Sequence, residues 1–397
     1  MNKKLPPNWS WVKLGDYIEK IPTTGKKLKQ KEYLIEGKYP VVDQGKELVG
    51  GFSNDQELLL NCNLPVIVFG DHTKAKKLIP FNFIPGADGV KVIKPNKEFD
   101  TKLFYYFLHV LPIPDKGYSR HFQYVEKSHI PLPPLPEQHR IVDKIEELFS
   151  ELDNGIENLK KAKAQIKTYR QAVLKFAFEG KLIQGEGKKV KGKSENRELP
   201  EGWELVALGE FCDKVSNAKD LDPNFEFLYL DIGGIDNKIN KIVSHKEYQW
   251  KDAPSRAKQL VHEGDLLFST VRTYLKNIAL VPPRYSGQIA STGFCVIRPK
   301  KHLLLSEYIF HLTLYEKFLE PLNALQTGSS YPAVRDKDVF SQKIPLPPLK
   351  KQIQIVEEIE RRFSVADKLE AAIDESLKKS EALRQSILKQ AFEGKLV

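Results

Sequence analysis

Cysteine is scarce in this sequence, and its scarcity excludes two classes of protein. The three cysteines, Cys62, Cys212 and Cys295, are odd in number and lie far apart along the chain. They cannot build a disulfide framework, and they lack the close spacing of a metal-binding motif. No apolar run approaches the length of a membrane span, and no signal-peptide core follows residues 1–4. We therefore expect a cytoplasmic protein that does not contact a membrane.

The familiar motifs of catalysis are also missing. The sequence has no phosphate-binding Gly-Lys-Ser/Thr loop, no Gly-rich cofactor fingerprint and no Asn-Pro-Pro-aromatic motif of amino-methyltransferases. Glu-x-Lys, half of a common nuclease pattern, occurs at 36–38, 179–181 and 393–395, but Lys/Glu-rich chains produce this tripeptide by chance. His72 follows Asp71, yet no Ser or Cys nucleophile lies beside the pair, so we expect a DNA contact or a polar loop residue.

What the chain does have is length and positive charge. Its 397 residues exceed one ordinary hydrophobic core, so two or more domains are expected. The formal net charge of +10 at pH 7 favours an anionic partner such as nucleic acid. Charge alone is weak evidence for this, because many other proteins are basic.

One long stretch occurs twice, at residues 130–182 and 344–396. Ile-Pro-Leu-Pro-Pro-Leu opens each copy and Ala-Phe-Glu-Gly-Lys-Leu closes it. The offset is 214 residues at both ends, 130 against 344 and 182 against 396. A surface loop would tolerate insertions in one copy. The constant length therefore predicts a paired structural element.

Each copy is predicted to form one long helix. Apolar residues recur at spacings of four and three, the pattern of a coiled-coil seam. The seam positions of the first copy are Ile141, Ile145, Leu148, Leu152, Leu159, Ile166, Tyr169 and Val173, thinned by Gly155 and Ala162. Those of the second are Ile355, Ile359, Ala366, Leu369, Ile373, Leu383 and Ile387, interrupted by Ser376 and Ser380. Gly180 and Gly394 give the stop signals. We expect the copies to pair with each other; the alternative is two ordinary bundle helices.

The segments that precede the two helices share an order of elements more than a sequence. Leu-Pro-Pro-Asn-Trp at 5–9 and Leu-Pro-Glu-Gly-Trp at 199–203 open them. Each then has a buried strand, a polar basic loop, a strand between Gly and Pro, an apolar helix and a second polar loop. In the first segment these five elements lie at 66–69, 71–77, 89–95, 103–111 and 117–121. In the second they lie at 266–268, 269–276, 293–299, 308–319 and 327–331. We predict two similar small α/β domains whose loops carry recognition.

The predicted fold class is α+β with five parts. The first domain covers 1–130 and its long helix 131–183; a basic linker covers 184–198; the second domain covers 199–344 and its long helix 345–397. The linker has no apolar periodicity, which favours a flexible solvated tether. Its lysines could instead contact DNA.

Residues suited to DNA reading gather in the predicted loops. Lys and Arg suit phosphates, Arg also suits guanine edges, and Gln and Asn suit adenine edges. The candidates of the first domain are Gln44, His72, Lys74, Lys76, Lys77, Tyr118, Ser119, Arg120, His121 and Gln123. Those of the second domain are Arg256, Arg272, Thr273, Tyr274, Lys276, Asn277, Ser329, Ser330, Tyr331 and Arg335. The alternative for each one is an ordinary solvated loop residue.

The repeated elements resemble those of a known family. The Pro run followed by Pro-Glu-Gln-His-Arg-Ile-Val at 136–142, then Phe149, Ser150 and Asp153, closely resembles the conserved helix of type I restriction-modification specificity subunits. The two Ala-Phe-Glu-Gly-Lys-Leu helix ends resemble it as well. The second copy departs from the pattern, with Lys-Lys-Gln-Ile at 350–353. The resemblance implies two target recognition domains, joined by two long antiparallel coiled-coil helices in a pseudo-twofold repeat.

The same resemblance implies a non-catalytic subunit that reads a split double-stranded DNA target. The helices would space the half-sites as a ruler and dock two methyltransferase subunits, which a restriction (motor) subunit can join. S-adenosylmethionine, Mg and ATP are expected only in those partners, and no cofactor is expected in this chain.

Two alternatives from other classes stay open. One is an interaction scaffold whose Pro runs are polyproline ligands. The other is a degenerate nuclease–methyltransferase fusion. Salt-dependent, sequence-specific DNA binding distinguishes the first alternative from a specificity subunit. Metal- or S-adenosylmethionine-dependent activity of the isolated chain distinguishes the second.

Overall fold

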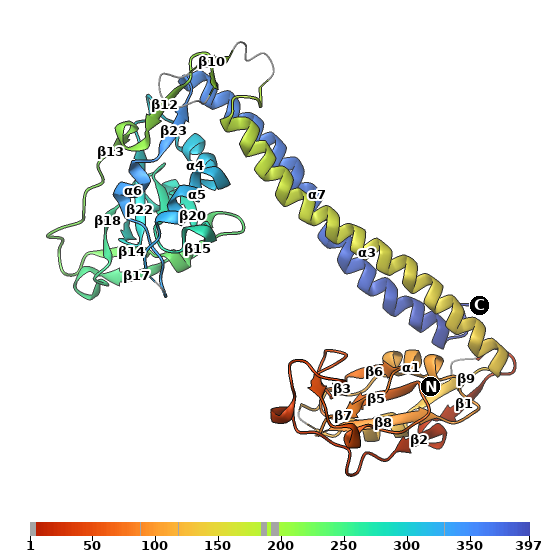
Figure 1. Cartoon of the computed structure of the whole chain (residues 1–397). Coiled ribbons are helices and arrows are strands. Elements are labelled where there is room, and N and C mark those ends of the chain that lie inside the picture. Colours follow the sequence, from red (N-terminus) through yellow and green to blue (C-terminus); the bar gives the residue numbers. More distant parts are fainter. Residues whose placement is uncertain (1–4, 88, 118, 184–188, 192–197, 329) are drawn as a thin grey trace. The chain divides into compact units, whose positions relative to one another are not determined.

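The computed structural model describes residues 5–87, 89–117, 119–183, 189–191, 198–328 and 330–397. The chain divides into two compact units, residues 1–161 with 373–397, and residues 162–372 (Figure 1). Each unit holds one globular domain and parts of both long helices. β10 (Lys189–Lys191), within the predicted linker, pairs with β11 (Glu198–Pro200) at the start of the second domain, a strand pair that no periodicity of the sequence indicates.

The domain of the first unit is built on a four-stranded sheet of order β2-β8-β5-β6, beside a three-stranded sheet of order β4-β3-β7. Its strands are β1 (Ser10–Lys13), β2 (Ile18–Ile21), β3 (Tyr39–Val42), β4 (Gly51–Ser53), β5 (Val66–Gly70), β6 (Lys76–Ile79), β7 (Ile84–Pro85), β8 (Val90–Pro95) and β9 (His129–Leu132). Its helices are α1 (Thr101–Val110) and α2 (Phe122–Lys127). The predicted strands at 66–69 and 89–95 and the predicted helix at 103–111 are confirmed.

The domain of the second unit repeats this plan with the sheets β13-β22-β19-β20 and β17-β14-β21-β18. Its strands are β12 (Glu204–Ala207), β13 (Cys212–Asp213), β14 (Glu226–Leu230), β15 (Ile235–Asp236), β16 (Lys241–Ile242), β17 (Lys246–Gln249), β18 (Ala257–Leu260), β19 (Leu266–Ser269), β20 (Ile278–Leu280), β21 (Ile289–Ser291), β22 (Phe294–Pro299) and β23 (Lys343–Leu346). Its short helices are α4 (Ser306–Leu314), α5 (Glu316–Leu325) and α6 (Asp336–Phe340). The single helix predicted at 308–319 is wrong, because the extended backbone of Tyr315 (φ −73°, ψ 128°) separates α4 from α5.

The first half of the Pro run before each long helix is a strand, β9 or β23, and its last two prolines lead directly into the helix. In β9, Pro131 lies opposite Trp11 of β1. In β23, Pro345 lies opposite Leu205 of β12. Proline cannot donate a ladder hydrogen bond, and it is tolerated here because each sheet has only two strands. The opening Trp segment and the Pro run of each domain are thus held together directly before the helix begins.

A buried glutamine ties the start of each long helix to its domain. Gln138 is fully buried. It accepts a hydrogen bond from the Asp100 amide (2.7 Å) and donates to the carbonyls of Glu98 (2.8 Å) and Pro133 (2.9 Å). We name this set of three bonds the glutamine clamp.

The second domain has its own glutamine clamp. The buried Gln352 accepts from Leu305 (2.9 Å) and donates to Leu303 (2.8 Å) and Pro347 (2.9 Å). The clamp is therefore kept although residues 350 and 351 depart from the first copy.

The long helices are α3 (Leu135–Phe178) and α7 (Leu349–Phe392), each of 44 residues. They run antiparallel within each unit (Figure 1). In both units an arginine of one helix contacts the other helix. We define the arginine clamp as this residue together with the Phe and Asp that it meets on the other helix.

The two arginine clamps have the same composition and spacing. In the first unit, Arg384 stacks on the Phe149 ring (4.3 Å) and pairs with Asp153. In the second, Arg170 stacks on the Phe363 ring (5.3 Å) and pairs with Asp367 (2.7 Å). Corresponding members of the two clamps differ by 214 in residue number (149 and 363, 153 and 367, 170 and 384). The two helices therefore pair in the same register in both units.

The predicted seam is confirmed at eight positions and wrong at three positions beside charged contacts. Ile141, Ile145, Ile166, Val173, Ile355, Ile359, Ala366 and Ile387 are buried as predicted. Tyr169, Leu369 and Leu383, predicted in the seam, are 42%, 54% and 50% exposed. Each of these three directly precedes Arg170, Glu370 or Arg384, which contacts the partner helix. Neighbouring helix positions point about 100° apart, so the apolar side chain turns outward.

Both long helices end as the glycines predict. Gly180 and Gly394 have a left-handed φ of 68°. The amides of Lys181 and Lys395 then donate back to the carbonyls of Phe176 (2.7 Å) and Gln390 (2.9 Å). Among the described residues, no helix combines the length and the apolar character needed to span a bilayer.

Removing a glutamine clamp should destabilise its unit. Gln138→Leu leaves an amide and two carbonyls buried without partners, so we expect a loss of at least about 2 kcal/mol in the free energy of unfolding. The matched control is Gln165→Leu at an exposed position of the same helix. Urea denaturation followed by circular dichroism measures both. Equal midpoints for the two variants would contradict the role assigned to the clamp.

The buried His311 should make stability depend on pH. It is 5% exposed, its Nδ1 atom has no hydrogen-bond partner among the described residues, and burial lowers its pKa from 6.5 to about 4. The unfolded chain therefore binds more protons than the folded one between these values, so stability falls as the pH decreases from about 6.5 towards 4. Urea midpoints at pH 7, 6 and 5 should fall less steeply in His311→Leu than in the parent.

The control for this measurement is His302→Leu, because His302 is exposed in the same domain. Part of the slope should remain in His311→Leu, since burial also lowers the pKa of His109 to about 4. The same pH slope in the parent and in His311→Leu would contradict this assignment.

Candidate nucleic-acid interface

In the first domain, three loops meet at the end of β5. The amide of His72 lies 3.4 Å from Gln44 Oε1, and the His72 ring Nδ1 lies 3.2 Å from the Ser119 carbonyl oxygen. The Thr73 hydroxyl donates to the Gln44 carbonyl at 2.6 Å. Gln44, His72 and Ser119 are thus brought together, and the exposed Arg120 follows directly.

Two glycines allow these loops to come so close. A Cβ atom on Gly70 would lie 2.9 Å from the Gln44 Cβ atom. One on Gly89, which has a left-handed φ of 67°, would lie 2.7 Å from Cδ2 of His72. Any side chain at either position would therefore push the loops apart.

The lysines of this region differ in their access to a ligand. Lys74 is half-buried and pairs with Asp115 at 3.3 Å, and burial lowers the pKa of the half-buried Lys76. Lys77 is only 5% exposed and donates from Nζ to the Asp43 carbonyl at 2.8 Å. Lys77 therefore braces the loop that follows β3, and we remove it from the predicted phosphate contacts.

His121 is also part of the fold rather than of its surface. It is fully buried, and its amide donates to the Asp71 carbonyl at 2.8 Å. The carboxylate of the buried Asp71 accepts from the Phe122 amide at 2.8 Å. Asp71 and His121 therefore join the β5 loop to the start of α2, which leaves His121 no surface for DNA.

In the second domain, the half-buried Arg272 stacks on the exposed Tyr331. Arg272 Nη2 donates to the Ser330 carbonyl at 2.9 Å, and its guanidinium lies 5.1 Å from the centre of the Tyr331 ring. Tyr331 is 72% exposed and Tyr274 is 52% exposed. A guanidinium held against an exposed aromatic ring suits a guanine edge or a base face.

Two neighbours of this pair face inward. Thr273 is 2% exposed and donates from Oγ1 to Asn323 Oδ1 at 2.6 Å. Lys276 donates from Nζ to the Leu314 carbonyl at 3.2 Å, and burial lowers its pKa. Both residues fix the loop against α4 and α5. We remove the buried Thr273 from the predicted contacts, while Lys276, whose side chain is 26% exposed, stays a prediction.

The remaining candidates divide by exposure. Arg256 and Ser330 are exposed, while Arg335 is exposed but bound to Asp338 (3.1 Å) at the start of α6. Gln123 is exposed and donates to the Arg120 carbonyl, and Asn277 is half-buried. Tyr118 and Ser329 lie outside the described residues.

Asn237 and Asn240 also support this region, and neither was predicted from the sequence. Their side chains donate to backbone carbonyls of the loop that carries Arg272 and Lys276. The signal for them was the turn-like run Asp-Asn-Lys-Ile-Asn at 236–240.

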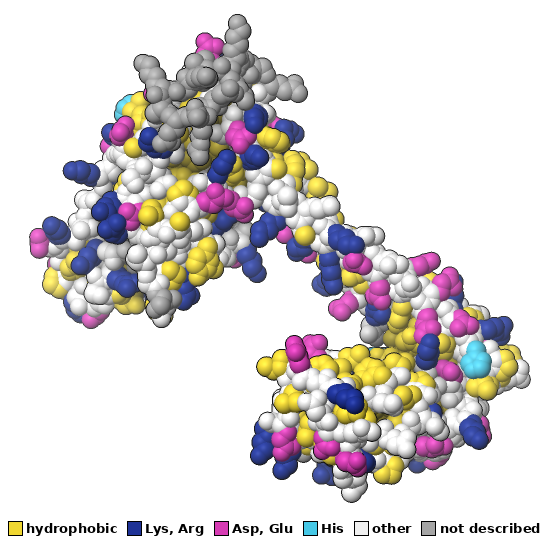
Figure 2. Space-filling view, in the orientation of Figure 1, with side chains coloured by type: hydrophobic (Ala, Val, Ile, Leu, Met, Phe, Trp, Pro, Cys, Tyr) yellow, Lys and Arg dark blue, Asp and Glu magenta, His cyan; other side chains and the backbone are white. Residues whose placement is uncertain are grey.

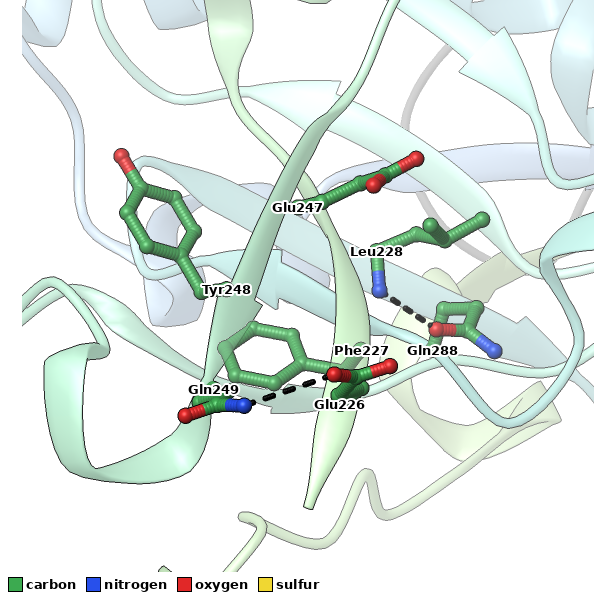
Figure 3. Close-up of a pocket in the computed structure, with 7 residues that line it drawn as sticks. All are labelled: Glu226, Phe227, Leu228, Glu247, Tyr248, Gln249 and Gln288. Carbon is green, nitrogen blue, oxygen red and sulfur yellow. Dashed lines mark hydrogen bonds between the residues drawn. The ribbon is translucent and has the colours of Figure 1, made fainter. Parts of the chain in front are cut away.

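A surface pocket of about 450 Å³ on β14 and β17 does not suit a polyanion. It is lined by Glu226, Phe227, Leu228, Glu247, Tyr248, Gln249 and Gln288 (Figure 3). Two carboxylates face it and no Lys or Arg lines it, so a phosphate would be repelled. Among the described residues, no group of three or more His, Cys, Asp and Glu side chains is placed to hold a metal ion.

Side chains of both charges are mixed along the long helices. Along α3 and α7, Lys and Arg side chains alternate with Asp and Glu (Figure 2). Many of these pair with each other, as Lys144 does with Glu147 and Arg361 with Glu358. We therefore place the DNA contacts on the domain loops rather than on the helices.

Two related α/β domains with basic and aromatic loops, each fastened to a pair of long helices, define a two-headed nucleic-acid reader. The chain belongs to the family described as type I restriction modification DNA specificity domain, which matches residues 6–167 and 200–379 separately.

Known proteins resemble the chain over nearly its whole length. It is 25% identical to the type I restriction enzyme EcoDI specificity subunit of Escherichia coli, across 99% of this chain and 90% of that protein. It is also 25% identical to the EcoR124I/EcoR124II specificity subunit of Escherichia coli, across 94% and 91%. A chain from a solved type I R-M system has the same fold, with a TM-score of 0.69, 21% identity and 99% of both chains covered.

The different positions of Arg120 and Lys77 make a testable contrast. Arg120→Gln should reduce the slope of log affinity against log salt by about 1 if Arg120 meets a phosphate. Lys77→Met removes the same charge from a buried site, so it should leave the slope unchanged and lower the urea midpoint. Fluorescence anisotropy with a random-sequence duplex from 50 to 200 mM salt measures the slopes. A larger slope change in Lys77→Met than in Arg120→Gln would contradict the placement of both residues.

Proposed function

We propose that each domain of this specificity subunit reads one half of a split duplex DNA target. The observation that carries the proposal is the duplicated reader. Two domains match the family separately, and each has exposed or half-buried side chains in corresponding loops. The side chains differ, with His72 and Arg120 in one domain and Arg272 and Tyr331 in the other. The two half-sites should therefore differ in sequence.

The paired helices then act as the spacer between the half-sites. Both helices have 44 residues, and their arginine clamps select one register in both units. A helix of this length spans roughly 66 Å at 1.5 Å per residue. Equal lengths and a shared register support a fixed gap rather than a variable one.

We further propose that two methyltransferase subunits dock along the helices. The exposed Tyr169 and Leu383 support two docking sites, because they occupy equivalent positions, 214 residues apart, and each lies next to a clamp arginine. S-adenosylmethionine, Mg and ATP would then be bound by the methyltransferase and restriction subunits, and catalysis would take place there. The cytoplasm is the expected compartment of such a complex.

Two observations disfavour the alternatives. A scaffold that presents polyproline ligands needs free Pro runs, yet Pro131 and Pro345 lie within paired strands. A degenerate nuclease needs a catalytic Glu-x-Lys, yet at residues 179–181 and 393–395 this tripeptide forms the C-terminal turns of the long helices.

Changing the length of both helices tests the spacer. One heptad inserted after Leu159 and one after Leu377 keeps the facing surfaces of the pair and adds about 10 Å, the rise of roughly three base pairs. We expect the preferred gap to lengthen while both half-sequences stay the same. Selection of bound duplexes with the methyltransferase partner present measures both features.

The control inserts the heptad into α3 alone, which breaks the helix pairing and should abolish selection of any fixed gap. An unchanged gap in the doubly extended protein would contradict the spacer. A changed half-sequence would contradict the assignment of reading to the loops.

A further inference from the structure

The second domain has a hairpin that lies against its recognition loop, residues 272–276. The hairpin, β15 and β16, belongs to the connection between β14 and β17. Asn240 Nδ2 donates to the carbonyls of Lys276 (2.9 Å) and Ile278 (3.2 Å), and Asn237 Nδ2 donates to that of Leu275 (2.9 Å). Three backbone carbonyls between residues 275 and 278 are thus bonded to two amide side chains.

The recognition loop needs such support because its backbone is strained. Arg272 and Lys276 have left-handed φ values of 51° and 55°. Residues other than glycine and asparagine rarely adopt such values. Strained residues of this kind persist only where their surroundings hold them. The loop carries Arg272 and Tyr274, so its backbone path decides where the exposed groups point.

Asn240 suits this task for two reasons. Its own φ is 52°, a left-handed value that asparagine tolerates better than most residues. Its amide supplies the two N–H groups that the carbonyls of Lys276 and Ile278 accept. A residue that cannot adopt the left-handed backbone would disturb the hairpin, and one without the amide donors would no longer hold the 272–276 loop.

The first domain holds its loop in a corresponding way with different atoms. The connection from β3 to β4, residues 43–50, lies beside the loop that follows β5. There the Gln44 carbonyl accepts from Thr73 (2.6 Å), and Gln44 Oε1 lies 3.4 Å from the His72 amide. In the first domain, the connection after β3 thus holds the loop after β5. In the second domain, the connection after β14 holds the loop after β19.

We propose that Asn240, assisted by Asn237, is a positioning residue for base reading by the second domain. Asn240 itself does not contact DNA. It holds the loop so that Arg272, stacked on Tyr331, meets a base edge in a single orientation. The inference rests on the proposed function, since it assigns a determinant to one half-site only.

The test uses the full chain with its methyltransferase partner. The target is first selected from random duplexes, and Arg272→Ala identifies the half read by the second domain. Competition binding against every single-base change in each half then gives a discrimination profile for the parent and for the variants Asn240→Asp, Asn240→Gly and Asn237→Ala.

The variants separate the amide donors from the backbone shape. Asn240→Asp is isosteric but cannot donate, and its charge repels the two carbonyls. Asn240→Gly keeps the left-handed backbone and loses only the side chain. The matched control is Asn224→Gly, an exposed turn residue of the same domain that bonds to no residue of the 272–276 loop among the described contacts.

We expect Asn240→Asp and Asn240→Gly to lower second-half discrimination about tenfold, and Asn237→Ala to lower it less because it removes one bond. The first-half profile and the salt slope should stay at the parent values, since no phosphate contact is lost. A retained first-half profile demonstrates that the first unit is folded, and a parent-like urea transition demonstrates the same for the second unit, which carries the substitutions.

Parent-like second-half discrimination in both Asn240 variants would overturn the inference and leave the proposed function standing. A loss that is equal in both halves would also overturn it, because it would indicate general unfolding. A parent without discrimination in the second half would contradict the proposed function, and the inference with it.

Discussion

An arginine of each long helix lies across a phenylalanine ring and beside an aspartate of the other helix, and the pairing of the helices depends on this contact. A partly exposed ion pair contributes at most about 1 kcal/mol, and the stacked ring adds a similar amount. The importance of the clamp lies in the register that it selects. The seam between the helices is weakened by Gly155, Ala162 and Ser376, so apolar packing alone specifies the alignment poorly. A slip of one turn would part Arg384 from both Phe149 and Asp153.

The register has a consequence for the domains only because each domain is fixed to a helix. The glutamine clamps provide this connection, with every polar atom of a buried amide matched to the backbone of the domain. The core of each unit then includes the start of one helix and the end of the other. Ile141 and Ile387 share one cluster, and Val173 and Ile355 share the other. A change in the helix pairing would therefore alter the core packing of both recognition domains.

The parts of this structure that could be predicted from sequence are those set by repetition and local pattern. The constant offset identified both helices, and the Gly and Pro residues around 89–95 bounded a strand correctly. Long-range contacts could not be predicted. Lys77 and His121 look like loop residues, and only the fold brings Asp43 and Asp71 to them. The seam failed at Tyr169 and Leu383 because periodicity counts apolar residues, whereas here the adjacent arginine faces the other helix.

The most direct test of the account is selection of bound duplexes from a random library by the complete chain with its methyltransferase partner at moderate salt. Two readers on a spacer of fixed length predict a split consensus, two different half-sequences separated by one constant gap. A single continuous half-site would contradict the account, because only one domain would then read DNA. Uniformly salt-sensitive binding without any enriched sequence would contradict it as well, and would favour a scaffold.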